Sequence, residues 1–204
     1  DDFPDISPDG RHIVYSNSQE TFTVLKTDPD SDTEVAVFDA RHAVIGLGIV
    51  YLISQIIIGR ILEQIGGPEV FKLQVTGWNA EIYLDTFADW QSRGLMDFYH
   101  AHFIFDDIHW VWYALSLSAL LAAVLNRAAK PESWNWLLAL PFVAGLSDFL
   151  ENSIQHVFLV GTDGATIIDP LPAISTLASL TKWGLALGLT ILILVVFVSG
   201  RKKA

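Results

Sequence analysis

The stretch WLLALPFVAGLSDFLENSIQHVFLV, residues 136–160, decides the fold. It is apolar and long enough to cross a hydrocarbon core of about 30 Å, which takes about 20 helical residues. Four of its polar residues lie at helical spacing and share one stripe of a helix: Asp148, Glu151, Asn152 and Gln155. An ionisable side chain that faces lipid costs about 2.5 kcal/mol or more. The stripe therefore predicts a helix inside a bundle, with its polar side turned toward other helices.

Three further stretches are apolar enough to cross a membrane, over about residues 43–62, 108–125 and 173–199. Because backbone polar groups cannot stay unpaired in lipid, each stretch is expected to be a helix. The sequence therefore predicts an all-α integral membrane protein, a four-transmembrane-helix bundle over residues 42–204. Membrane lipids are its first expected partners.

Basic residues in the short loops predict the orientation, since Lys and Arg stay on the cytoplasmic side. Arg127 and Lys130 follow the second span, and the tail 200–204 carries three more basic residues, whereas the loop 161–171 carries none. We therefore expect a multi-pass membrane protein with a cytoplasmic C-terminus and residues 63–107 outside. The side of the N-terminal segment stays open.

Composition places an aqueous segment before the first span. Residues 1–41 hold ten acidic and three basic residues, so seven of the eleven net negative charges lie there. Turn residues separate β-rich runs at 12–15, 21–25 and 34–38, which predicts a short acidic β-meander. Without cysteine there is no disulfide and no thiolate nucleophile, and without a basic patch we expect no nucleic acid partner.

The first strands carry a resemblance. FPDISPDGRHIVYS, residues 3–16, followed by TFTVLKTD, residues 21–28, resembles one blade of a TolB-type β-propeller repeat. One blade cannot close a propeller, so a small β-cap or a set of docking strands is the alternative reading.

The external segment 63–107 begins with the helix breaker Gly66-Gly67-Pro68. Its later part, DTFADWQSRGLMDFYHAHFIFDD at 85–107, sets aromatic and aliphatic residues among charged ones. This pattern predicts an amphipathic helix lying at the membrane interface and leading into the second span. Gly94 is a predicted break within it.

Lys182 provides a partner for the acidic stripe. It lies ten residues into the fourth span counted from Pro172, about 15 Å deep at 1.5 Å per residue, which is level with Glu151 and one turn from Asp148. We predict an ion pair between Lys182 and these carboxylates, with Asn152 and Gln155 completing their hydrogen bonds. The five residues form the predicted intramembrane polar cluster.

A second group of polar residues precedes and begins the second span, as an outer-mouth cluster: His100, His102, Asp106, Asp107 and His109. Imidazole and carboxylate groups at this spacing suit a divalent metal, but a solvated or helix-capping cluster explains them as well, and we expect no metal. His156 in the third span could ligate a pigment or haem iron. The alternative is a hydrogen-bonded interior histidine, and we expect no cofactor.

The transmembrane part resembles a group of small, uncharacterised bacterial four-helix membrane proteins. The residues that carry the resemblance are Leu84-Asp85, Arg93-Gly94, Tyr99, Asp107, Tyr113, Asp148-x-x-Glu151-Asn152 and Lys182. Its most specific element is the Asp-x-x-Glu-Asn motif inside an apolar helix. The resemblance implies the membrane fold and a location in the bacterial inner (cytoplasmic) membrane, and it brings no established activity.

Three functions fit these features. The first, which we predict, is a non-catalytic accessory or scaffold subunit of a larger bacterial membrane complex of respiratory or photosynthetic type, with other membrane subunits as partners. The second is an intramembrane acid–base enzyme, an isomerase or hydrolase of a lipid-like substrate, with Asp148 and Glu151 as acid and base and Lys182 tuning them. The third is a proton pathway through the same residues.

Overall fold

The computed structural model describes residues 5–6, 12–16, 22–26, 40–160 and 166–199. The chain divides into two compact units, Asp1–Gly46 and Leu47–Ala204, which are taken separately below. Three features used for the sequence predictions lie outside the described residues: the β-rich run 34–38, most of the acidic loop at 161–165, and the basic tail 200–204.

The N-terminal unit contains three short strands, β1 (Asp5–Ile6), β2 (His12–Ser16) and β3 (Phe22–Lys26). They pair antiparallel in the order β1-β2-β3, with His12 opposite Lys26. The β-rich runs 12–15 and 21–25 coincide with β2 and β3 to within one residue. A β-meander that folds as an acidic aqueous segment, and its resemblance to a propeller blade, stay predictions.

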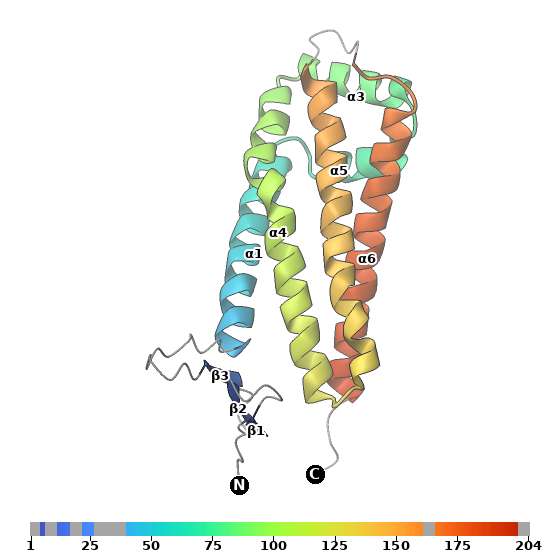
Figure 1. Ribbon diagram of the computed structural model, residues 1–204. Helices are drawn as coiled ribbons and strands as arrows, with labels where there is room; N and C mark the ends of the chain where they lie inside the picture. The colour runs from blue at the N-terminus through green and yellow to red at the C-terminus, as the bar shows by residue number, and fades with distance from the viewer. Residues whose placement is uncertain (1–4, 7–11, 17–21, 27–39, 161–165, 200–204) are drawn as a thin grey trace. The chain divides into compact units, whose positions relative to one another are not determined.

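The rest of the described chain is helical (Figure 1). Its elements are α1 (Ala40–Glu63), α2 (Pro68–Thr76), α3 (Ala80–Ser92), α4 (Met96–Arg127), the 3-10 helix η1 (Glu132–Ala139), α5 (Leu140–Val160) and α6 (Leu171–Ser199). Four of these segments are long and apolar enough to cross a membrane, at Val44–Glu63, Met96–Arg127, Glu132–Val160 and Leu171–Ser199. The prediction of four apolar, membrane-spanning helices is therefore confirmed at the level of length and composition.

Burial is arranged as a lipid environment requires. Large apolar side chains on the outer faces are exposed, for example Leu146 at 58% and Leu187 at 64%, whereas Asp148 and Glu151 in the interior are at most 1% exposed. A protein surrounded by water rarely presents such extensive apolar faces. The outer faces of the long helices therefore suit contact with acyl chains, and the polar stripe faces the bundle interior as predicted.

The helices α4, α5 and α6 lie side by side, and α2 packs against α6 (Figure 1). A close approach between α4 and α5 is made at Gly145, where a Cβ atom would stand 2.9 Å from the Trp110 ring and 3.3 Å from the Trp110 carbonyl oxygen. The pair Gly184 and Gly188 on α6, spaced as in helix-packing motifs, makes no such close approach. A Cβ atom at either glycine would meet nothing within 4 Å. Of these three glycines, only Gly145 lies at a close contact between two helices.

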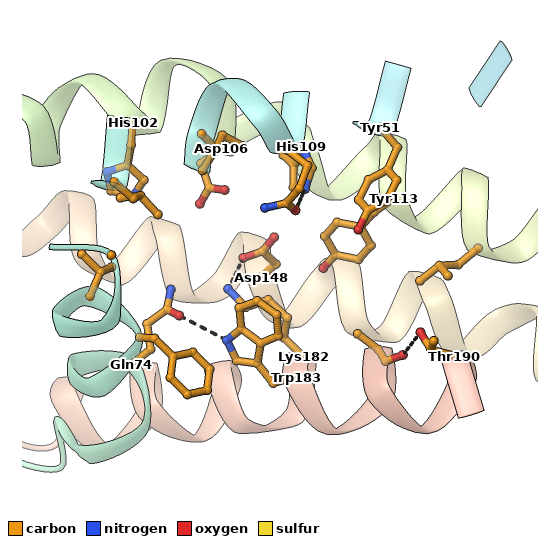
Figure 2. A pocket seen from close by; sticks show the side chains of 18 residues that line it. Tyr51, Gln74, His102, Asp106, His109, Tyr113, Asp148, Lys182, Trp183 and Thr190 are labelled. Carbon is orange, nitrogen blue, oxygen red and sulfur yellow. Dashed lines mark hydrogen bonds and ion pairs between the residues drawn. The ribbon is translucent and has the colours of Figure 1, made fainter. Parts of the chain in front are cut away.

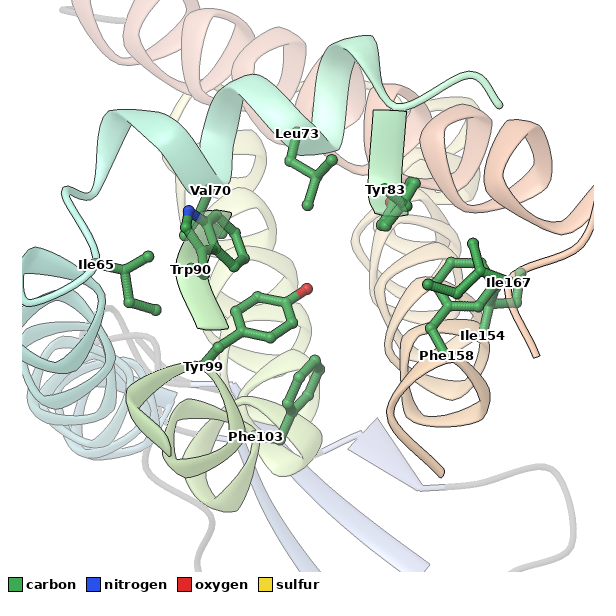
Figure 3. Close-up of a cluster of buried hydrophobic side chains, with 10 residues drawn as sticks. All are labelled: Ile65, Val70, Leu73, Tyr83, Trp90, Tyr99, Phe103, Ile154, Phe158 and Ile167. Carbon is green, nitrogen blue, oxygen red and sulfur yellow. The ribbon is translucent and has the colours of Figure 1, made fainter. Parts of the chain in front are cut away.

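The predicted break at Gly94, within the predicted interfacial helix at 85–107, is confirmed. Gly94, with φ of +70°, separates α3 from α4, so the apolar residues belong to two helices. Trp90, Tyr99 and Phe103 are buried with residues of α2 and α5 in one apolar cluster (Figure 3), whereas Phe98 and Phe105 are exposed, and a position at the membrane interface stays a prediction. The cluster comprises Ile65, Val70, Leu73, Tyr83, Trp90, Tyr99, Phe103, Ile154, Phe158 and Ile167.

A polar contact joins α2 to α3 beside this apolar cluster. Glu69 Oε2 accepts hydrogen bonds from Trp90 Nε1 at 3.1 Å and from Arg93 Nη2 at 2.6 Å. The Arg93 and Trp90 hydrogen bonds hold the pKa of the Glu69 carboxyl below its ordinary value of 4.5. Because this carboxyl is half-exposed, solvent screens the contact, and it stabilises the fold only weakly.

Replacing Gly145 with Ala is expected to destabilise the protein by about 1–3 kcal/mol, because the new methyl group overpacks the α4–α5 contact. The thermal unfolding temperature in detergent measures the effect. Gly188→Ala is the matched control: it adds the same methyl group to a helix where nothing opposes it, and should be neutral or slightly stabilising. Equal effects of the two substitutions would contradict the assigned packing.

Replacing Glu69 with Gln is expected to lower the unfolding temperature slightly at pH 6. A carboxyl with a depressed pKa stabilises the fold above its ordinary value of 4.5, and this contribution is lost as the pH falls through the folded-state pKa. The difference between wild type and Glu69→Gln should therefore shrink below pH 4.5. Asp85→Asn, at an exposed position of α3, serves as the control. If the difference in unfolding temperature between wild type and Glu69→Gln does not depend on pH, the contact of Glu69 with Arg93 and Trp90 is contradicted.

Candidate functional site

The centre of the bundle contains the ion pair that the sequence predicts. Lys182 Nζ of α6 lies 2.7 Å from Asp148 Oδ1 and 2.7 Å from Glu151 Oε2 of α5. The contact with Asp148 is also a hydrogen bond, whereas the contact with Glu151 is an ion pair by distance without hydrogen-bond alignment. All three side chains are buried, so the lysine compensates two carboxylates that lie one helical turn apart.

The two amides of the predicted polar cluster have separate roles. Gln155 Nε2 donates to the second Glu151 oxygen at 3.0 Å, and Gln155 Oε1 accepts from the Tyr99 hydroxyl. Asn152 was expected beside the ion pair, but its Nδ2 instead donates to Asp106 Oδ2 of α4 at 3.0 Å. Asn152 thereby connects the polar stripe of α5 to α4.

Tyr83, a neutral tyrosine, borders the polar cluster next to Gln155. Tyr83 of α3 lies 3.4 Å from Ser175 of α6, whose hydroxyl is also near Gln155. Burial raises the pKa of Tyr83 to about 12. The Tyr83 hydroxyl therefore stays protonated at neutral pH and adds a hydrogen bond without adding charge.

The predicted outer-mouth cluster does not form one site. His100 is exposed, and Asp107 is half-exposed and pairs with His156 Nε2 at 2.9 Å. His102, Asp106 and His109 instead face the bundle interior, because they lie four and three residues apart on another face of α4. Among the described residues, no three acidic, histidine or cysteine side chains converge as metal ligands.

His156 also differs from its predicted setting. Its side chain is 47% exposed on the outer face of α5, contacts Asp107, and lies 4.6 Å from the Phe103 ring. It is hydrogen-bonded but not interior. A pigment or haem contact through His156 stays a prediction.

The interior face of α4 borders a cavity of about 290 Å³ (Figure 2). Five residues of this face line it, Leu117 and four that carry polar groups at positions i, i+4, i+7 and i+11: His102, Asp106, His109 and Tyr113. Asp148 and Lys182 line it from α5 and α6, whereas Glu151 lies behind Lys182 and does not reach the cavity. The remaining wall is largely apolar and includes Ile58, Leu62, Val70, Phe71 and Ala186.

Helix α1 closes one side of the cavity through polar contacts with His109. Ser54 Oγ lies 2.5 Å from His109 Nδ1, Gln55 Oε1 lies 3.1 Å from His109 Nε2, and the Tyr51 ring stacks on the imidazole at 5.4 Å. Most other α1 side chains are exposed. His109 is therefore a polar attachment point of α1, alongside the apolar contacts of the buried Ile58 and of Leu62.

One polar atom in the cavity wall has no partner. The Tyr113 hydroxyl is buried and makes no hydrogen bond to any described residue. A buried hydroxyl without a partner costs about 1–3 kcal/mol. A cavity that combines such a group with two carboxylates, a lysine and an apolar wall has the composition of a small-molecule site.

Comparisons with known proteins add no assignment. No protein-family model, curated protein or solved structure matches the chain. The resemblance to small bacterial four-helix membrane proteins therefore stays a prediction, and function is argued from the site.

Replacing Lys182 with Met is expected to destabilise the protein by about 3–5 kcal/mol, because two carboxylates then lie buried without a cation. The monodisperse fraction after detergent extraction and the unfolding temperature measure this loss. Lys72→Met, which removes an exposed lysine of α2, is the control and should have little effect.

Adding Asp148→Asn and Glu151→Gln to Lys182→Met should restore folding, because the triple variant removes every charge of the ion pair together. If Lys182→Met is as stable as wild type, or the triple variant is no better than the single one, the assigned ion pair is contradicted.

Proposed function

We propose that this protein is a membrane-embedded acid–base enzyme that acts on a lipid-like substrate held in the cavity. The observation that carries the proposal is the presence of two carboxylates, Asp106 and Asp148, in the wall of an otherwise largely apolar cavity inside a bundle of apolar helices. A lipid-like molecule can place its apolar part against Ile58, Phe71 and Leu117. Its reactive part then lies between the carboxylates.

The geometry favours a revised assignment of acid and base. Sequence reasoning paired Asp148 with Glu151, but Glu151 does not line the cavity and Asp106 does. We assign Asp148 as the acid and Asp106 as the carboxylate base of the proton transfer, with Lys182 and Glu151 holding Asp148 in place. Figure 2 shows both aspartates projecting into the cavity from facing helices.

Double-bond isomerisation is the reaction class that two such groups support without a further reactant. A carboxylic acid donates a proton to one end of a carbon–carbon double bond, and a carboxylate removes a proton from the carbon beyond the other end. The double bond moves by one position. The substrate gains one proton and loses one, and so do the two carboxyl groups taken together. Oriented groups in a site without bulk water make such transfers efficient.

We further propose the setting in which this chemistry occurs. The basic loop after α4 and the basic tail suggest a cytoplasmic C-terminus in a bacterial inner membrane. The loop between α5 and α6, which has no basic residue, then lies on the opposite side. The cavity lies between the long helices, at a depth that lipid chains reach.

An accessory or scaffold subunit is the second candidate, and the packing of α1 favours it. Only 6% of the apolar window in α1 is buried, the smallest share among the four candidate spans. A helix of a partner subunit could cover such a face. In that case the Lys182 ion pair fixes the helix register and performs no chemistry.

The enzyme proposal predicts incorporation of solvent hydrogen into a lipid. Wild-type protein in vesicles of total bacterial lipid extract, incubated in D₂O, should introduce non-exchangeable deuterium into one lipid class, as detected by mass spectrometry. Asp148→Asn should reduce the rate at least about 100-fold, since general acid–base groups contribute about 10²–10⁴ in rate. Asp107→Asn, which alters a carboxylate outside the cavity, should retain the wild-type rate.

Equal incorporation by wild type and Asp148→Asn would overturn the enzyme proposal. If there is no incorporation and the protein is extracted in fixed stoichiometry with other membrane proteins, the subunit is supported instead.

A further inference from the structure

We propose that the substrate of this cavity is a cationic amphiphile, an ammonium group carried on an apolar chain. The inference rests on the proposed function, because it names the chemical class of the molecule in the same site. It is drawn from the balance of charge in the cavity wall and from the atoms there that lack partners.

The interior holds more acid than base. Asp106, Asp148 and Glu151 face a single described cation, Lys182, which pairs with Asp148 and Glu151. Asp106 accepts one hydrogen bond from Asn152 and pairs with no cation among the described residues. A carboxylate held away from bulk water needs a compensating charge. A bound ammonium group supplies it.

Other groups in the cavity wall suit an ammonium group. The Tyr113 hydroxyl is buried beside Asp148 and has no well-aligned hydrogen bond to a described residue, and its oxygen keeps a lone pair that can accept from a ligand N–H. The aromatic rings of Tyr51 and Trp183 also line the cavity, where the Tyr51 ring stacks on His109 and the Lys182 ammonium lies 5.4 Å from the Trp183 ring centroid. Aromatic faces attract cations, so the Trp183 ring already serves one cation in this wall.

Other occupants fit these groups less well. An anionic head group would meet Asp106 and Asp148 without a free cation, since Lys182 is already paired. A metal ion would require several oxygen or nitrogen ligands, and no three acidic, histidine or cysteine groups converge in the described residues. An organic cation needs only one carboxylate and a few acceptors.

Size and lining indicate the rest of the molecule. A volume of about 290 Å³ holds roughly ten groups of the size of a water molecule, at about 30 Å³ each. The head group occupies the polar end, and Ile58, Leu117 and Ala186 form an apolar wall for a short alkyl segment.

The test uses three probes with one chain length and different head groups: decylamine, decanol and decanoate. Each is titrated into full-length protein in phosphatidylcholine nanodiscs at pH 7, where the amine is protonated, and affinity is read from the rise in unfolding temperature. The expected result is that decylamine binds at least tenfold more tightly than decanol, and that decanoate does not bind.

Variants connect this preference to the assigned atoms. Asp106→Asn should remove the tenfold preference for decylamine over decanol, whereas Asp107→Asn on the outer face should keep it. Tyr113→Phe should weaken decylamine binding severalfold with little effect on decanol, which keeps the inference testable if Asp106→Asn folds poorly.

The outcomes separate the two proposals. If decanol or decanoate binds as tightly as decylamine, the cationic substrate is overturned and binding of a lipid-like molecule stands. If no probe binds, both proposals fail. If decylamine is preferred equally by wild type and Asp106→Asn, the assignment of the head group to Asp106 is wrong.

Discussion

The structure depends on one buried lysine that compensates two carboxylates. Lys182 lies 2.7 Å from both Asp148 and Glu151, and all three side chains are enclosed by apolar helices. None of these charges is tolerated alone at such depth, so the contact fixes the register of α5 against α6. Further polar side chains surround this ion pair. Gln155 donates a hydrogen bond to Glu151 and accepts one from the Tyr99 hydroxyl. Lys182, its two carboxylates, Gln155 and Tyr99 therefore form one connected polar network.

The parts of this arrangement that follow from helical geometry could be predicted from the sequence. Asp148, Glu151 and Gln155 share a stripe because their spacing matches the helical repeat, and Lys182 meets it because adjacent antiparallel spans place residues at equal depth. The four apolar helices follow from length and hydropathy in the same way. In each case one helix, or one pair of neighbours in the chain, contains all the information.

The remaining features depend on contacts between distant segments. Asp106 and Asp107 were grouped because they are adjacent, yet a helix turns about 100° per residue and directs them to different surroundings. The spacing of His102, Asp106, His109 and Tyr113 was a usable signal for the cavity wall. The attachment of α1 through His109, and the burial of Trp90 and Tyr99 under α2, had no local signal, because the partner residues lie far away in the chain.

The central claim is that Lys182 and Asp148 meet inside the bundle while the protein is in a bilayer. Solid-state NMR of protein in lipid vesicles, with ¹⁵N-lysine and ¹³C-aspartate labels, measures the dipolar coupling between Lys182 Nζ and the Asp148 carboxyl carbon. The account predicts the strong coupling of a directly hydrogen-bonded pair, together with a lysine signal that water cannot rapidly exchange. Absence of this coupling, or a Lys182 ammonium in fast exchange with bulk water, would contradict it.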